Sequence, residues 1–174
     1  MTRAELADLY DRHADTLFCF LISFTNSEDE SREVLQDLFA NLAKGKRKIP
    51  KTADLKNYLI KAARNLAIDL TRRRQSRART VRQLQVAPQL PIFAETEDPD
   101  AQLFQDQVAN ALTTLPDDQR EAVHLKLWTG LTFEQIAETC GISPNTAASR
   151  FRYGIDKMRT QLRPVYEELT QDVA

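Results

Sequence analysis

Apolar residues recur at steps of three and four along most of the chain, which is the spacing of one face of an α-helix. In the first half this pattern predicts helices over residues 4–25, from Asn26 or Ser27 to about residue 43, and from Asp54 to about Arg74. In the second half it predicts a helix around residues 103–115 that Pro116 ends, and another that Asp117 caps and Gly130 ends. No run of alternating Val, Ile and Thr indicates a sheet.

The stretch Thr132–Arg159 predicts two further helices joined by a tight turn. Thr132 is a good N-cap for the first of them, because Gln135, three residues later, can return a hydrogen bond to the cap amide. Gly141 is expected to end that helix in the left-handed conformation, which a residue without a Cβ adopts easily. Ser143 then caps the second helix, with a proline in its first turn. This is a helix-turn-helix pattern.

The second of these helices has an apolar and a polar face on a helical wheel. The apolar face, expected in the core, holds Ala147, Phe151, Ile155, Met158 and Leu162. The opposite face holds Asn145, Thr146, Ser149, Arg152 and Tyr153, with Arg150 on the flank. Such groups can contact phosphates and base edges of DNA. An ordinary helical hairpin with a solvated face is the alternative, and Pro164 is expected to end or kink the helix.

The stretch Gln83–Asp100 separates two groups of predicted helices. It holds three prolines and an acidic end without a helical period, which is typical of a linker. Only 4 glycines occur in the whole chain, which also favours helices over loop-rich folds. The expected fold is therefore all-α, with two small helical domains, residues 1–80 and 102–174, joined by a linker over 81–101.

Charge is distributed unevenly, although the net charge of the chain is only −1. Residues 44–82 hold 14 basic and 2 acidic residues, whereas the segments before and after them are net acidic. Residues 143–163, which cover the polar face described above, hold five basic residues and one acidic residue. Two positively charged segments flanked by net acidic segments concentrate positive potential where a polyanion would bind.

The main positive segment begins in a loop over residues 44–53 and continues along a helix. In the loop the candidates for DNA binding are Lys46, Arg47, Lys48 and Lys51. The polar face of the helix holds Asn57, Lys61, Arg64, Asn65, Ile68 and Arg72, and Arg72 and Arg73 open a basic run. Of these, the DNA-binding candidates are Lys61, Arg64, Asn65, Arg72 and Arg73. Neutralisation of phosphates explains this density, because solvated helix ends usually mix charges of both signs.

Other classes of site have little support in the sequence. Cys19 and Cys140 each lie in an apolar helical setting without a Cys or His at ligand spacing, so buried thiols are expected in place of a disulfide or a metal site. His13 and His124 lack a nucleophile or carboxylate in register, so no catalytic site, enzyme activity or cofactor is expected. The chain has no apolar run of membrane-span length and no signal-peptide pattern, and a cytoplasmic protein is expected.

Four ordered runs carry a family resemblance. They are L-Y-D-R-H-A-D-T-L-F at 9–18, S-R-E-V-L-Q-D-L-F at 31–39, Y-L-I-K-A-A-R-N-L-A-I-D-L-T-R at 58–72 and L-P-D-D-Q-R-E-A-V at 115–123. With the helix-turn-helix after them, nearly the whole chain resembles an extracytoplasmic-function (ECF) sigma factor, a two-domain subunit of bacterial transcription initiation.

The resemblance implies a role for each domain. The first, similar to sigma region two, would bind the clamp of core RNA polymerase and capture the melted minus-ten strand with the basic loop and helix. Glu33, Gln36, Asp37 and Phe39 occupy the clamp-facing motif, although composition alone would leave this acidic face solvated. The second domain, similar to region four, would place residues 144–153 in the major groove of the minus-thirty-five element and dock on the polymerase flap.

The resemblance also implies that an anti-sigma protein could bind between the domains, with the apolar linker residues Leu90–Phe93 as a contact. Two positions depart from the family pattern. Tyr58 replaces a frequent Trp, and Ala148 replaces a frequent Lys or Arg, so Arg150 and Arg152 are expected to carry more of the DNA binding. Two alternatives stay open: a helix-turn-helix regulator that acts without polymerase recruitment, and a promoter-inactive adaptor or decoy.

Overall fold

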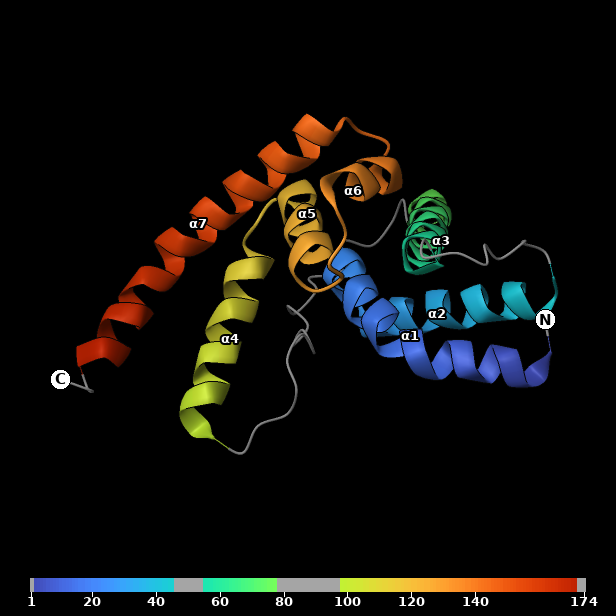
Figure 1. Cartoon of the computed structure of the whole chain (residues 1–174), viewed down its shortest axis with the longest axis horizontal. Coiled ribbons are helices and arrows are strands. Elements are labelled where there is room, and N and C mark those ends of the chain that lie inside the picture. Colours follow the sequence, from blue (N-terminus) through green and yellow to red (C-terminus); the bar gives the residue numbers. More distant parts are fainter. Residues whose placement is uncertain (1, 46–54, 78–97, 172–174) are drawn as a thin grey trace. The chain divides into compact units, whose positions relative to one another are not determined.

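The computed structural model describes residues 2–45, 55–77 and 98–171. Within these ranges the chain forms helices and no strand, so the prediction of an all-α protein is confirmed (Figure 1). The helices are α1 (Arg3–Thr25), α2 (Glu28–Ala43), α3 (Leu55–Arg77), α4 (Pro99–Thr113), α5 (Asp117–Leu127), α6 (Phe133–Cys140) and α7 (Pro144–Gln171). They belong to two compact units, one built on α1 to α3 and the other on α4, α5, α7 and the start of α6.

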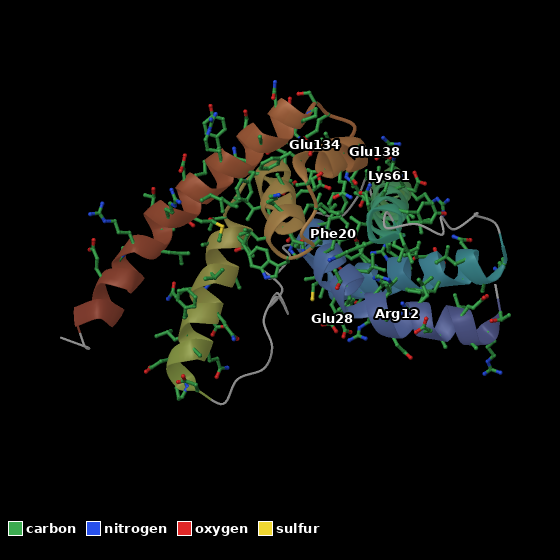
Figure 2. The ribbon with its side chains drawn as sticks, in the orientation of Figure 1. Arg12, Phe20, Glu28, Lys61, Glu134 and Glu138 are labelled. Atoms are coloured by element: carbon green, nitrogen blue, oxygen red, sulfur yellow. The ribbon has the colours of Figure 1, made fainter. Side chains whose placement is uncertain are left out.

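The first unit is a bundle of α1, α2 and α3. Phe20, labelled in Figure 2, is fully buried in it. Thr2 and Glu5 form a capping box that starts α1, with the Glu5 amide donating to Thr2 Oγ1 at 3.2 Å. Asn26 ends α1 in the left-handed conformation. Ser27 is the N-cap of α2, because its side chain accepts from the Glu30 amide. The fully buried side chains of this core include Leu17, Leu21, Leu38, Leu59, Ile60 and Ala63.

Two helices of the second unit begin at different residues from those predicted. α4 begins at Pro99 with Asp98 as its N-cap, so the last residues of the predicted linker are helical. The start is well formed, because Pro suits the first turn of a helix and the Asp98 carboxylate accepts from the Asp100 amide at 3.1 Å. Asp117 is the first residue of α5 and does not cap it; Pro116 occupies the cap position.

The last helix, α7, is longer than predicted. It continues through Pro164 to Gln171, so of the two outcomes predicted for Pro164, an end or a kink, the end is wrong. Pro164 is exposed, and water can therefore satisfy the carbonyl that loses its helical donor. On the apolar face, Ala147 and Met158 are buried as predicted. The other three members of that face are only partly buried: Phe151, Ile155 and Leu162.

Gly154 is a point of close approach between α7 and α5. A Cβ at this position would lie 2.6 Å from Val123 Cγ2 and 3.3 Å from the backbone oxygen of Gln119. Carbon atoms in contact prefer a separation of about 3.5–4.0 Å. Since Val123 is itself fully buried, a larger residue at position 154 would force one helix away from the other.

Arg120 joins the end of α4 to α5. Its side chain is 4% exposed, and its Nη1 donates to the backbone oxygens of Leu115 at 3.2 Å and Thr113 at 3.4 Å. Its Nη2 donates to Asp117 Oδ1 at 2.6 Å. The last carbonyls of a helix have no donor within the helix itself, and Arg120 supplies one for this end of α4.

His124 is a packing residue of α5. It is fully buried, and its ring stacks on that of Trp128 with 5.4 Å between the centroids. Burial lowers the pKa of His124 from 6.5 to about 4, because the charged imidazolium would lose its hydration.

Acidification is therefore expected to destabilise the second unit through His124. The pKa is lower in the folded chain than in the unfolded chain, so the unfolded state binds the proton first as the pH falls below 6.5. Stability that is complete above pH 6.5 is lost as the pH falls towards 4, with a loss of about 2 kcal/mol by pH 5. Urea unfolding at pH 7 and pH 5, followed by the fluorescence of Trp128, measures the loss.

The control variant is His124→Phe, which keeps an aromatic ring but cannot be protonated. It should lose clearly less stability between pH 7 and pH 5 than the wild type does. An equal loss in both proteins would show that other groups cause the pH dependence.

Two further predictions concern the cysteines and membrane-spanning helices. Cys19 and Cys140 are not joined in a disulfide, and each is partly buried, whereas the sequence predicts buried thiols. Burial and the nearby Asp15 raise the pKa of the Cys19 thiol. Among the described residues, no helix combines the length and the hydrophobicity that crossing a membrane requires.

Candidate nucleic-acid interface

Local hydrogen bonds define the helix-turn-helix, as the sequence predicts. The Thr132 amide donates to Gln135 Oε1 at 2.9 Å, and the Gln135 amide donates to Thr132 Oγ1 at 3.3 Å, which completes the capping box of α6. Gly141 has a φ of +70°, the left-handed value expected of a residue that ends a helix. Ser143 caps α7, because its Oγ accepts from the Thr146 amide at 3.1 Å. The predicted start, stop and restart of the two helices are confirmed.

The first turn of α6 is anchored on both sides. The rings of Phe133 in α6 and Phe151 in α7 lie 5.7 Å apart. Lys126 of α5 donates to the backbone oxygen of Leu131 at 3.2 Å, and its ammonium lies 4.8 Å from the Phe133 ring centroid. These contacts hold the start of α6 against α5 and α7, so α7 is fixed relative to its neighbours in the second unit.

The polar face of α7 is largely open to solvent. Asn145, Thr146 and Arg152 are exposed, and Tyr153 is 55% exposed. The Arg152 guanidinium lies over the Tyr153 ring at 5.4 Å, a cation–π contact that orients both side chains. Ser149 is partly buried, so the exposed part of this face consists mainly of the other four residues.

Arg150 differs from Arg152 in its surroundings. Its side chain is 30% exposed, and its Nε lies 3.2 Å from Asp118 Oδ2 in α5. The sequence placed Arg150 on the flank of the polar face but did not identify Asp118 as its partner. The pair leaves Arg152 as the more accessible guanidinium on this face.

The basic face of α3 is exposed at its C-terminal end. Asn65, Arg72 and Arg73 are exposed, whereas Lys61 and Arg64 are partly buried. The Arg64 guanidinium packs over the Phe24 ring of α1 at 5.6 Å, which explains its partial burial. The helical wheel places Asn57 on this polar face, but Asn57 is buried. Ile68, on the same face, is partly buried. The loop candidates lie outside the described residues: Lys46, Arg47, Lys48 and Lys51.

The candidate polymerase-binding residues of α2 differ in exposure. Gln36 and Asp37 are exposed, and the Glu33 side chain is 47% exposed. Phe39 is only 7% exposed, and its ring packs edge-on against that of Tyr10, with 4.8 Å between centroids. Phe39 therefore lies beneath this surface, and Tyr10 is 47% exposed beside it.

Chemically, these surfaces are suited to binding. They offer guanidinium, amide, hydroxyl and carboxylate groups on exposed helix faces, which suits contacts with nucleic acid and protein. Among the described residues, no group of three or more His, Cys, Asp and Glu side chains could hold a metal ion.

Two family models match the chain. The model described as "Sigma-70 region 2" matches residues 9–77, which cover α1, α2 and α3 from Leu9 onward. The model described as "Sigma-70, region 4" matches residues 105–158, which include the helix-turn-helix. Both models thus fall on the segments for which the sequence suggested these regions.

Curated relatives and a solved structure agree with these models. The chain is 28% identical over 156 residues to the ECF RNA polymerase sigma factor SigL of Mycobacterium tuberculosis, with 89% of this chain and 87% of that protein covered. It is 29% identical over 155 residues to the RNA polymerase sigma factor CarQ of Myxococcus xanthus, with the same coverage.

The solved structure is that of the sigma factor RpoE in complex with the anti-sigma factor NepR from Bartonella quintana. RpoE has the same fold, with a TM-score of 0.64 at 22% identity over 90% of this chain and 97% of that chain. The chain therefore belongs to the sigma-70 family of RNA polymerase sigma factors, in its extracytoplasmic-function group.

Proposed function

We propose that this sigma factor binds core RNA polymerase and directs it to promoters by reading a minus-ten and a minus-thirty-five element. The observation that carries the proposal is the exposed polar face of α7, on a capped helix-turn-helix within the region 4 match. In this role the protein catalyses no bond change and acts in the cytoplasm, where polymerase and promoters meet. The two units divide the work, with residues 1–80 and 102–174 as domains on either side of a linker.

The second unit reads duplex DNA at the minus-thirty-five element. The major groove of B-DNA admits an α-helix, and base edges there are distinguished by amide and guanidinium groups. Asn145, Thr146 and Arg152 are the exposed side chains that make such contacts. Arg150, held beside Asp118, lies at the edge of this surface and contacts a phosphate. Ala148 offers no charged group, so the two arginines carry the positive charge of this face.

The first unit binds the melted strand at the minus-ten element. Single-stranded DNA needs a positive surface along its backbone and a platform for unstacked bases. Arg72 and Arg73 supply exposed charge at the end of α3, and Asn65 lies exposed on the same helix. Tyr58, a partly buried aromatic residue at the start of α3, is the candidate for stacking.

The acidic face of α2 binds the polymerase. Glu33, Gln36 and Asp37 recur at helical spacing, so they form one exposed surface that can pair with basic residues. Phe39 and Tyr10 support this surface as an aromatic pair. The matched relatives are named as RNA polymerase sigma factors, which is the reason for assigning this partner.

An anti-sigma protein is a further proposed partner. The sigma factor RpoE of Bartonella quintana was solved with one, and its fold is similar to that of this chain. The predicted contact at Leu90–Phe93 lies outside the described residues. Co-purification from cells that express a tagged copy of the chain would identify such a partner.

The test of the proposed function has two steps. Mapping of transcript starts after overexpression returns the promoter motif, and run-off transcription with purified core RNA polymerase then tests it. We expect transcripts from that promoter only when the protein is present. Duplex binding without polymerase binding would indicate a helix-turn-helix regulator instead, and polymerase binding without promoter-dependent transcription would indicate an adaptor or decoy.

Replacing Glu33 with Gln and Asp37 with Asn together is expected to weaken binding of core polymerase about tenfold to a hundredfold. The side-chain shapes are kept, but two charges proposed to pair with basic residues of the polymerase are lost. The loss of binding free energy is roughly 1.4–2.8 kcal/mol in total. Competition with labelled wild-type protein for core polymerase measures the change. The matched control is Glu28→Gln on the same helix (labelled in Figure 2), whose carboxylate pairs with Arg32. Equal weakening by the control would exclude a specific role for this face.

A further inference from the structure

Arg74 has surroundings that set it apart from the two arginines before it. Its Nη1 lies 2.6 Å from Glu30 Oε1, and its Nη2 lies 2.7 Å from Glu33 Oε2. Arg72 and Arg73 are exposed on the same helix, in the run that was expected to neutralise phosphates. The guanidinium of Arg74 is instead directed at α2, where two carboxylates balance its charge.

The two carboxylates differ in exposure. The Glu30 side chain is 15% exposed, so it is poorly placed to meet another protein and serves as the anchor of Arg74. The Glu33 side chain is 47% exposed and belongs to the face that is proposed to bind polymerase. Arg74 engages Oε2 of Glu33, and a carboxylate has about four acceptor positions, so the same group can accept from a second donor.

We infer that Arg74 is a positioning residue for polymerase binding, which holds the Glu33 carboxylate towards a basic group of the polymerase and makes no contact with DNA. This inference rests on the proposed binding of polymerase through α2. A planar guanidinium can bridge two carboxylates in one geometry, whereas a lysine ammonium acts as a single point charge. Because Arg74 holds Glu33 in place before binding, less side-chain freedom is lost when the complex forms.

The effect of this ordering is expected to be modest and measurable. Immobilising one flexible side chain in advance corresponds to about a threefold to tenfold gain in affinity. Arg74 is itself 45% exposed, and Arg74→Lys keeps a positive charge beside the largely buried Glu30, so variants at position 74 should fold. The inference is therefore tested by affinities, with unfolding curves as a check.

The experiment uses the full chain with Arg74→Lys, Arg74→Ala, Glu33→Ala, the double variant Arg74→Lys with Glu33→Ala, and Arg73→Ala as the matched neighbour. Affinity for core polymerase is measured by competition, and affinity for a single-stranded oligonucleotide is measured at several salt concentrations. We expect Arg74→Lys to weaken polymerase binding about threefold to tenfold. Arg74→Ala, which removes the charge as Arg73→Ala does, should leave the salt dependence of DNA binding unchanged. Arg73→Ala should leave polymerase binding unchanged and reduce the salt slope by about 0.7, the value for one phosphate contact on a single strand.

The double variant separates positioning from a general structural role. If Arg74 acts through Glu33, Arg74→Lys should cause no further loss in the Glu33→Ala background, because neighbours in one network are not additive. The inference is overturned if the two losses add, if Arg74→Lys leaves polymerase affinity unchanged, or if Arg74→Ala lowers the salt slope as Arg73→Ala does. A wild-type chain that does not bind core polymerase would overturn the proposed function itself, together with this inference.

Discussion

Replacing Arg120 with Ala is expected to lower the free energy of unfolding of the second unit by about 3 kcal/mol. The side chain is buried and donates to two backbone oxygens near the end of α4. Truncation removes hydrogen bonds from a charged donor, each worth about 1.5–3 kcal/mol, and leaves the acceptors unsatisfied. It also removes the packing of the long side-chain stem. Urea unfolding followed by Trp128 fluorescence measures the change.

A control separates this role from the ion pair with Asp117. The Asp117 side chain is 93% exposed, so Asp117→Ala removes only the outer partner of Arg120. Such exposed pairs contribute about 1 kcal/mol or less. If Arg120→Ala costs no more than Asp117→Ala, the hydrogen bonds to the α4 carbonyls do not stabilise the unit as argued.

Replacing Arg150 and Arg152 together with Ala is expected to reduce transcription from the cognate promoter at least a hundredfold. Arg152 is exposed on the reading face, and a good arginine contact with a base contributes about 1–3 kcal/mol of discrimination. Arg150 supplies a second positive charge at the edge of this face. Run-off transcription at subsaturating protein measures the loss, and Arg152→Ala alone should cause the larger share of it.

The control for the double variant is Arg159→Ala. Arg159 lies on the same helix, beyond the reading segment, and its side chain is 78% exposed. Its loss should change transcription less than threefold, since it removes an equivalent charge away from the groove. Full promoter-dependent transcription by the double variant would favour an adaptor or decoy over a promoter reader.

The helix-turn-helix could be predicted from the sequence because its signals are local. Thr132 and Gln135 are three residues apart and bond to each other, and Ser143 caps α7 through the amide of Thr146. Such contacts depend on little beyond the residues between them. The same reasoning limited the start of α2 to Asn26 or Ser27, and the structure has Ser27 as the N-cap.

The contacts that shape the candidate site could not be predicted in this way, because they join different helices. Arg74 and Glu30 are separated by 44 positions, and no spacing rule links them. Arg150 and Asp118 likewise meet only once α5 and α7 have packed. Tyr10 of α1 and Phe39 of α2 also meet only after packing, which leaves Phe39 7% exposed and Tyr10 47% exposed.

The close approach of α5 at Gly154 sets the register of α7. Val123 occupies the space that a Cβ of residue 154 would fill, and every neighbouring position of α7 carries a side chain. A slide of α7 by one residue would bring Tyr153 or Ile155 against Val123, which the packed interface cannot accept. The absence of a Cβ at Gly154 thus fixes the axial position and the rotation of α7, and with them the positions of the residues proposed to bind DNA.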